Sequence, residues 1–206
     1  MSIKSSAAAV CQKCGKEHKI DIYKSINSAE NPELKAAVLD GSLFLWECPH
    51  CGASNLVGYE CLYHDPDEKF MVWMLPFGLP EGPEKDAIVN QTKAMGDYRL
   101  RIVKNAGDLM EKVLVFDAGL DDRCIELVKW IASREEGMDG VSNLHFYRLQ
   151  DDVMVFSGVK GGAMQGFGFG LNVYEDCAGI IARNPDIAKE ESFAEVDSEW
   201  VNSVLG

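Results

Sequence analysis

The chain has 206 residues, of which 47% are hydrophobic, and its formal net charge is −13. A chain of this size can bury most of its apolar surface, either as one ordinary domain or as a small module joined to a larger one. Residues 1–65 contain six Lys and Arg and eight Asp and Glu. Residues 66–206 contain 14 Lys and Arg and 25 Asp and Glu. The acidic second part would repel a phosphate backbone, so the charge argues against general nucleic-acid binding.

The first ten residues contain one lysine and a four-residue apolar run. Such a run is too short for the core of a signal peptide, and no other stretch approaches the length of a membrane span. Seven cysteines, an odd number, fit a reducing compartment. We therefore expect a cytoplasmic protein without membrane contact.

The first third of the chain predicts a β-rich module with one helical insertion. Residues 18–27, 42–47 and 55–63 alternate like strands. Between the first two strands, Asn31-Pro32-Glu33 opens a short helix that Gly41 ends. One cysteine pair precedes the first strand and another separates the second from the third, which is the strand order of a zinc ribbon.

The two cysteine pairs have the spacing of a metal site. They are Cys11-Gln-Lys-Cys14-Gly and Cys48-Pro-His-Cys51-Gly. Each pair supplies half of a tetrahedron from a tight turn, and the glycine after it permits the positive φ that turns backbone N–H groups toward the sulfurs. We therefore predict that Cys11, Cys14, Cys48 and Cys51 bind one zinc ion in a closed structural site, which leaves no position for a catalytic water.

Two other uses of these cysteines stay open. Rubredoxins bind iron with two cysteine pairs of the same kind. If the four cysteines bind iron, this chain would be an electron-transfer protein. A reversible disulfide switch is the other alternative, although it does not require the flanking glycines. The remaining cysteines, Cys61, Cys124 and Cys177, stand among apolar neighbours and are expected to be buried thiols.

The sequence divides after the next predicted strand, residues 69–75. Three prolines and two glycines interrupt residues 76–84, which are the best candidate for a loop or linker. We therefore expect an α+β protein with a zinc-ribbon-like module over residues 1–75 and an acidic α+β domain over residues 85–206.

The second part alternates between strand and helix patterns. Its clearest helix starts at Asp121, which can cap it, and carries an apolar stripe at helical spacing. The other predicted elements are a strand over residues 98–103, a helix over 108–116, a hairpin of 144–149 with 153–159, and a helix over 197–205.

No catalytic motif is evident in the sequence. The glycine-rich segment 161–170 lacks the lysine and spacing of a phosphate-binding loop and is typical of a bent or edge strand. His64 stands close to Cys61 and Asp65, which permits a second site or a general base, but a turn at Asp65-Pro66 explains the same residues. An enzyme site near His64 and the glycine-rich segment is therefore the weakest of the functional hypotheses.

Several segments together resemble the bacterial and archaeal CpXC family. They are CQKCG, the insertion that leads to LFLWECPHCG, LYHDPDEKFMVWMLP, and RIVKNAGDLMEKVLVFDAGLDDRCIELVKW, within residues 8–132. The resemblance implies that Cys11, Cys14, Cys48 and Cys51 are metal-type ligands. It also implies that the protein is found in the cytosol of a prokaryote. The first cysteine pair, CQKCG, lacks the proline that follows the first cysteine of the second pair, CPHCG. The family is functionally uncharacterised, so the resemblance implies no activity.

Two functions from different classes follow from these observations. The first is a zinc-stabilised binding or adaptor module whose partner is another protein. The second is an iron or thiol redox protein that uses the same four cysteines.

Overall fold

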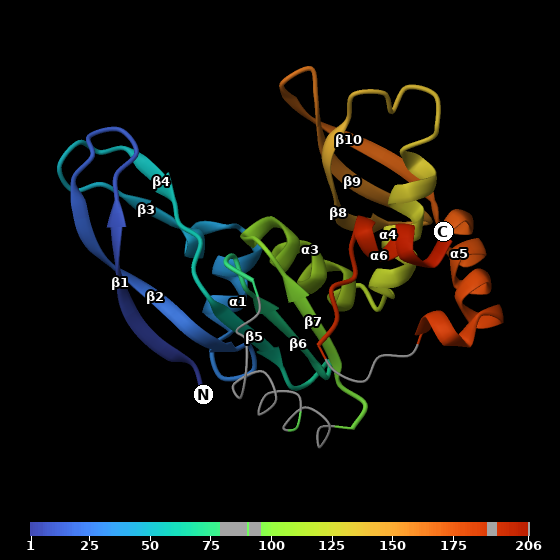
Figure 1. Cartoon of the computed structure of the whole chain (residues 1–206), viewed down its shortest axis with the longest axis horizontal. Helices are drawn as coiled ribbons and strands as arrows, with labels where there is room; N and C mark the ends of the chain where they lie inside the picture. Colours follow the sequence, from blue (N-terminus) through green and yellow to red (C-terminus); the bar gives the residue numbers. More distant parts are fainter. Residues whose placement is uncertain (79–89, 91–95, 189–192, 206) are drawn as a thin grey trace. The chain divides into compact units, whose positions relative to one another are not determined.

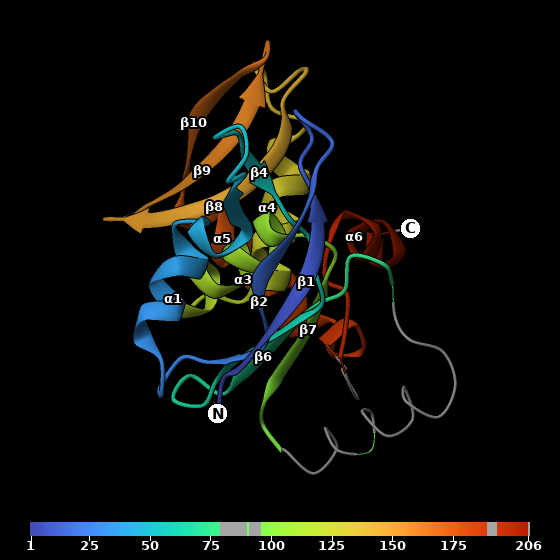
Figure 2. The same cartoon turned by 90° about the vertical axis from the view of Figure 1, so that its left-hand side faces the viewer.

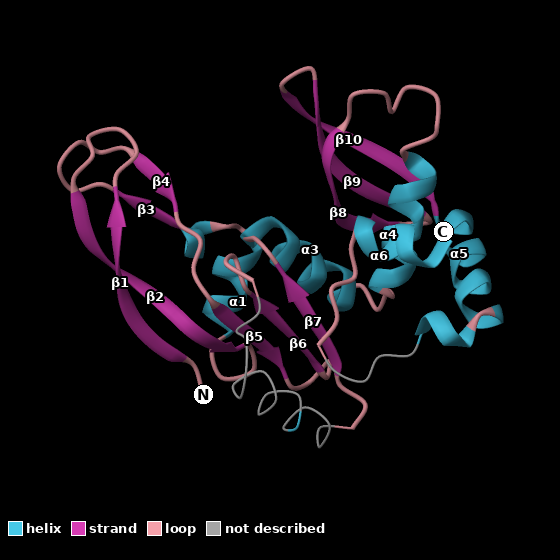
Figure 3. Cartoon of the chain, viewed as in Figure 1, coloured by secondary structure: helices cyan, strands magenta, loops and turns pink. Residues whose placement is uncertain are grey.

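The computed structural model describes residues 1–78, 90, 96–188 and 193–205. The chain divides into two compact units, Met1–Met110 and Glu111–Gly206. Each unit contains both helices and sheets, as Figure 3 shows, so the expected α+β class is confirmed. Among the described residues, no helix is long and apolar enough to cross a membrane.

The first unit is built on strands. They are β1 (Ile3–Val10), β2 (Glu17–Asn27), β3 (Leu45–Glu47), β4 (Ser54–Leu56), β5 (Cys61–Asp65), β6 (Phe70–Met74) and β7 (Arg99–Val103). Five of them form one sheet with the order β1-β2-β5-β6-β7, in which β1/β2 and β5/β6 are antiparallel and β2/β5 and β6/β7 are parallel. β3 and β4 form a separate antiparallel pair (Figure 1).

The helical insertion of the first unit begins where the sequence predicts it. Helix α1 (Pro32–Leu39) follows Asn31, and Gly41 ends the insertion with a φ of 77°. The next residues correct the predicted strand over residues 42–47, because Ser42–Phe44 form a 3-10 turn, η1. The carboxylate of Asp40 accepts a hydrogen bond from the backbone N–H of Ser42 at 2.8 Å and so holds the chain in a turn.

The predicted strand over residues 55–63 is two strands in two different sheets. β4 pairs with β3, whereas β5 pairs with β2 and β6. Between them, the N–H of Val57 donates to the carbonyl of Phe44 at 2.9 Å, which continues the β3/β4 register by one residue before the chain enters β5. Strand β1 was not predicted, since its serines and alanines carry little strand propensity and its eight-residue pairing with β2 supplies the stability.

The predicted loop or linker at residues 76–84 falls largely on residues 79–84, which lie outside the described part of the chain. β7 follows this segment and pairs with β6 in the sheet of the first unit. The division between the units therefore falls at Met110, well after the predicted linker.

The second unit combines a small sheet with helices. Helix α3 (Ala106–Asp117) runs across the division, and the unit continues with α4 (Asp122–Ala132), β8 (Ser142–Gln150), β9 (Val153–Lys160), β10 (Ala163–Gly170), α5 (Leu171–Arg183), η2 (Pro185–Ala188) and α6 (Ser198–Leu205). The sheet has the order β10-β9-β8 and is antiparallel throughout. The cap of α4 is confirmed, because Asp121 accepts a hydrogen bond from the N–H of Arg123 at 2.9 Å.

Buried side chains define the core of each unit. In the second unit, Met154 and Phe156 of β9 are fully buried and Phe146 of β8 is nearly so. Cys61, Cys124 and Cys177 are buried free thiols, as the sequence predicts. Burial is the first cause that raises the pKa of each of these three thiols.

Charged side chains of α3 and α4 form a buried cluster in the second unit. The Lys112 ammonium lies 2.9 Å from a carboxylate oxygen of Asp122 and 2.7 Å from the carbonyl oxygen of Val196. The Lys129 ammonium lies 2.9 Å from Glu111 and 2.8 Å from Glu126. Lys112 and Asp122 are 3% and 1% exposed, so their charges are almost fully withdrawn from water.

The cluster contains three carboxylates and two ammonium groups. Burial and the neighbouring charges shift the pKa values of Glu126 and Lys129. Burial raises the pKa of Glu126, Lys129 acts in the opposite direction, and the Glu111 carboxylate raises it again. Burial alone would lower the pKa of Lys129, but Glu111 and Glu126 outweigh it and raise that pKa. Each ammonium therefore compensates carboxylates that could not stay ionised in the core alone.

We predict that Lys112→Met destabilises the second unit by about 3–5 kcal/mol, because it removes the buried ammonium that Asp122, Glu126 and the Val196 carbonyl contact. Arg148→Met is the matched control, since Arg148 is an exposed cation of the same unit, and it should change stability by less than about 1 kcal/mol. Urea unfolding, followed by circular dichroism and amide exchange, measures both. Equal stability of the two variants would contradict the role of the cluster.

Candidate metal centre

The four predicted ligands come together at the end of the first unit where two loops meet (Figure 1). Cys11 and Cys14 lie in the loop between β1 and β2, and Cys48 and Cys51 lie in the loop between β3 and β4. All four Sγ atoms lie within 4.8 Å of one another. Among the described residues, this is the only group of three or more His, Cys, Asp and Glu side chains with the geometry to hold a metal ion.

The two cysteine loops have the same backbone design. In the first, the N–H of Gly15 donates to the carbonyl of Cys11 at 2.9 Å, and the N–H of Cys11 donates to the carbonyl of Lys16 at 2.9 Å. In the second, the N–H of Gly52 donates to Cys48 at 2.8 Å, and the N–H of Cys48 donates to Ala53 at 2.9 Å. The proline that only the second loop contains is therefore not needed for this turn.

Glycine is required at the same place in both loops. Gly15 and Gly52 have φ values of 68° and 66°, in the left-handed region that a side chain disfavours. This conformation lets each loop turn back into its following strand while both of its cysteines face the sulfur cluster. The positive φ that the sequence predicts for the two glycines is thus confirmed, whereas their own N–H groups donate to carbonyl oxygens and not to sulfur.

The sulfur positions suit a tetrahedral ion. Cys11 and Cys51 have their Sγ atoms 3.7 Å apart, and so do Cys14 and Cys48. A metal with bonds of about 2.3 Å to sulfur places tetrahedral sulfurs about 3.8 Å apart. Zinc and iron both accept four thiolates in this arrangement, so the donor set fits either metal.

Backbone donors and neighbouring sulfurs shift the thiol pKa values in opposite directions. Hydrogen bonding by the backbone N–H of Cys14 is the main cause that lowers the pKa of Cys11 to about 6. The N–H of Ala53 acts in the same sense on Cys51, but burial and the other sulfurs outweigh it and raise the pKa of Cys51 to about 11. One thiolate thus forms readily, whereas full ionisation of the cluster requires a cation between the sulfurs.

Asn55 joins the two cysteine loops and was missed by sequence reasoning. Its side-chain oxygen accepts a hydrogen bond from the N–H of Gln12 at 2.9 Å, and its side-chain nitrogen donates to the carbonyl of Ala53 at 2.8 Å. Asn55 is only 5% exposed, so both bonds are protected from water. The only signal in the sequence is a polar residue in a short strand directly after the second loop, which does not distinguish a buried amide from an exposed one.

Two histidines lie beside the cluster. Nε2 of His18 lies 3.5 Å from the Sγ of Cys48, and its ring lies 5.9 Å from that of Trp46. Nδ1 of His50 lies 3.1 Å from the ammonium of Lys16, at the surface. His18 can therefore donate a hydrogen bond to a ligand sulfur, which stabilises the thiolate form.

His64 does not belong to this cluster. It lies on β5, where its Nε2 is 3.3 Å from the hydroxyl of Tyr98. Burial is the main cause that lowers the pKa of His64. The neighbouring Asp65 accepts a hydrogen bond from the N–H of Glu68 at 3.2 Å and pairs with Lys35 at 3.1 Å, as the turn interpretation requires.

The glycine-rich segment 161–170 forms no phosphate-binding loop. Gly161 and Gly162 make the turn after β9, and the residues after them form strand β10. The predicted edge strand is confirmed.

A comparison with protein families adds one match. The family model described as CpXC protein matches residues 9–129, which include all four cysteines. Comparisons with curated proteins and with solved structures gave no match.

We predict that Asn55→Ala weakens metal binding by roughly 10- to 100-fold, because the two loops lose the side chain that aligns them. Gln12→Ala is the matched control: only the backbone N–H of Gln12 takes part, and its side chain is exposed. Competition with a chromophoric zinc chelator measures both affinities. A Gln12→Ala protein that loses as much affinity as Asn55→Ala would contradict this role.

Proposed function

The chain belongs to the CpXC family, and we propose that its four cysteines hold a structural zinc ion that stabilises a protein-binding or adaptor module. The observation that carries this proposal is the closed set of four sulfurs contributed equally by two loops. A zinc ion with four thiolate ligands has no open position for water or substrate, so its role is to fix the loops.

The part of the first unit that most needs such support is the β3/β4 pair. Each strand has three residues, and an isolated two-stranded hairpin is marginally stable at best in water. The metal would tie the loop of this hairpin to the loop between β1 and β2. Binding free energy on the order of 10 kcal/mol would then become folding free energy of this region.

An exposed apolar pair on this hairpin supports a protein partner. Leu45 and Leu56 lie directly opposite each other on β3 and β4, with exposed fractions of 50% and 71%. Single exposed leucines are common, but a pair of them on a rigid hairpin offers a small docking surface. The metal would give this surface a fixed shape.

The proposal includes a compartment. Four thiols available to a metal, and three further buried free thiols, are typical of proteins in reducing compartments. We place the protein in the cytoplasm of a prokaryotic cell, where such conditions are maintained.

We predict that the purified protein carries one zinc ion per chain, is colourless, and loses the metal in Cys48→Ser. Cys61→Ala is the matched control, because Cys61 is a buried thiol of the same unit outside the cluster, and it should keep the metal. Elemental analysis and visible absorbance measure the content. A red protein with stoichiometric iron would replace this proposal by the electron-transfer alternative.

We predict that a strong chelator exposes the backbone amides of the β3/β4 hairpin and of both cysteine loops, because these segments depend on the metal for their alignment. Hydrogen exchange read by mass spectrometry locates the change along the chain. Peptides from the second unit serve as the internal control and should exchange at an unchanged rate. Unchanged exchange in the first unit after the metal has been removed would contradict a structural role.

The adaptor role is tested at the exposed leucine pair. Affinity capture from the native cytosol with the wild-type chain should enrich a protein that Leu56→Ser fails to retain. Leu56 is mostly exposed, so the variant should keep its metal and its fold. The same captured proteins with both chains would argue against a docking surface on the hairpin.

A further inference from the structure

The three-stranded sheet of the second unit has two edges that are built differently. At one edge, β8 pairs with β9 through two register shifts, between Ser142 and His145 and between Phe146 and Arg148. The N–H of Phe146 donates to the buried carboxylate of Glu111 at 2.6 Å. Irregular pairing, and an N–H group that is already bonded to a charged side chain, keep a sheet edge from pairing with another strand.

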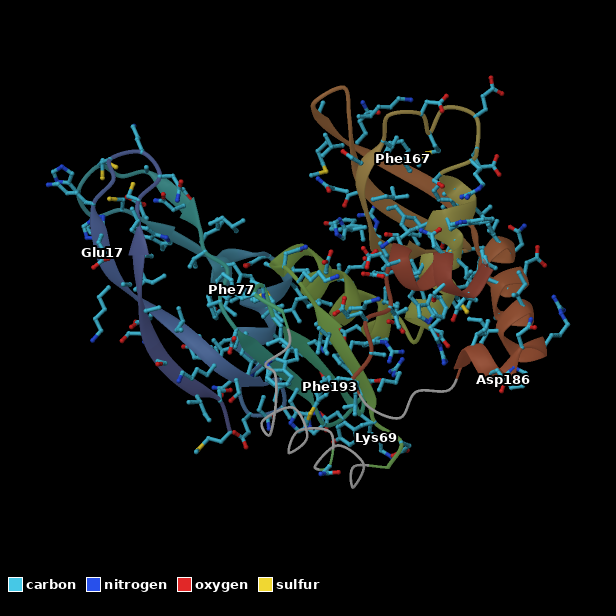
Figure 4. All side chains as sticks on the ribbon, in the orientation of Figure 1. Glu17, Lys69, Phe77, Phe167, Asp186 and Phe193 are labelled. Atoms are coloured by element: carbon cyan, nitrogen blue, oxygen red, sulfur yellow. The ribbon has the colours of Figure 1, made fainter. Side chains whose placement is uncertain are left out.

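The other edge, β10, has none of these devices. It pairs with β9 through eight consecutive positions without a register shift, and it contains no proline and no charged residue. Among the described residues, no strand pairs with its outer side. Figure 2 shows β10 along the outer margin of this sheet, and Figure 4 labels Phe167 on it.

The turn at Gly161 and Gly162 determines which backbone groups of β10 face outward. Both glycines have positive φ, 59° and 80°, as in a two-residue type I′ hairpin, so the flanking Lys160 and Ala163 form a hydrogen-bonded pair. Hydrogen-bonded and non-hydrogen-bonded pairs then alternate along the strands. The hydrogen bond from the N–H of Leu171 to the carbonyl of Asp152, at 2.8 Å, agrees with this alternation.

The outward N–H and C=O groups therefore belong to every second residue, namely Met164, Gly166, Gly168 and Gly170, except that the C=O of Gly170, the N-cap of α5, accepts the first hydrogen bond of that helix. Three of these four residues have no side chain. A Cβ atom at Gly166 would meet no side chain within 4 Å, whereas one at Gly168 would lie 3.2 Å from Cγ1 of Val153. An approaching strand thus meets bare backbone along most of this edge.

We propose that the free edge of β10 pairs with β10 of a second copy of this chain, in antiparallel orientation, to form one continuous six-stranded sheet. The site lies in the second unit and does not involve the metal. The lack of charge on this edge and the symmetric placement of Gly166 and Gly168 about Phe167 point to a second copy as the occupant. Residues 161–174 carry no charge in a chain of net charge −13, so two copies can meet here without bringing carboxylates of the two strands together.

An antiparallel arrangement also matches the residues of the two strands. With the two-fold axis at Phe167, Gly166 of one copy exchanges backbone hydrogen bonds with Gly168 of the other, and the reverse pair does the same. Met164, which is 71% exposed, then lies opposite Gly170 of the second copy, where the Asn172 side chain already fills the space beside the glycine, so the glycine-to-glycine pairing at Gly166 and Gly168 forms the centre of the interface. The same strand thus provides both halves of the interface.

Sedimentation of the full metal-bound chain, from micromolar to millimolar concentration, tests the pairing. The wild-type mass should double with rising concentration. Gly166→Lys should raise the dissociation constant at least about tenfold, because it places like charges across the paired strands. Tyr147→Lys is the matched control, since it adds the same charge on β8, where Tyr147 is exposed, and it should leave the dimer intact.

Hydrogen exchange gives a second readout that does not depend on a variant. The amides of Gly166, Gly168 and Gly170 should gain protection as the wild-type concentration rises, whereas the amides that face β9 should not change. A monomer over the whole concentration range would overturn the proposal. A dimer that Gly166→Lys leaves unchanged, or that forms without protecting these three amides, would overturn it as well.

Discussion

Mutual repulsion between thiolates is the constraint on which the first unit depends. Four sulfur atoms within 4.8 Å of one another cannot all be ionised unless a cation lies among them, and burial together with the neighbouring sulfurs raises the pKa of Cys51. The loops that carry these sulfurs are 33 residues apart in sequence, and the segment between them holds β2, α1, η1 and β3. A metal at this point therefore determines where a long insertion begins and ends.

The described part of the second unit contains a cluster of buried ion pairs and no comparable group of cysteines. Its helices α3 and α4 share buried ion pairs, and the Glu111 carboxylate of that cluster also caps the N–H of Phe146 on β8. Hydrophobic side chains of equal volume often cost less to bury than charges of this kind, whereas the loss of one partner leaves an uncompensated buried charge. Here the Glu111 carboxylate links α3 directly to β8 through the N–H of Phe146.

The sequence predicts best what depends on spacing or periodicity. Paired cysteines with flanking glycines identified all four sulfur positions, and an apolar stripe with a cap identified α4. Elements that depend on distant partners were harder to predict. β1 has weak strand propensity and needs β2, while α5 contains Gly179, which lowers its helix propensity. Asn55 was missed for the same reason, because its hydrogen-bond partner Gln12 is 43 residues away.

Glycines on the outer strand of the second sheet also have an entropic consequence. Each of Gly166, Gly168 and Gly170 loses more backbone freedom on folding than alanine would, by roughly 0.5–1 kcal/mol. β10 is hydrogen-bonded on one side alone within the described sheet, and the aromatic contact of Phe169 with Phe156, 5.6 Å between ring centres, helps to hold its inner face. Of the three strands of this sheet, β10 should therefore be the first to detach in local unfolding.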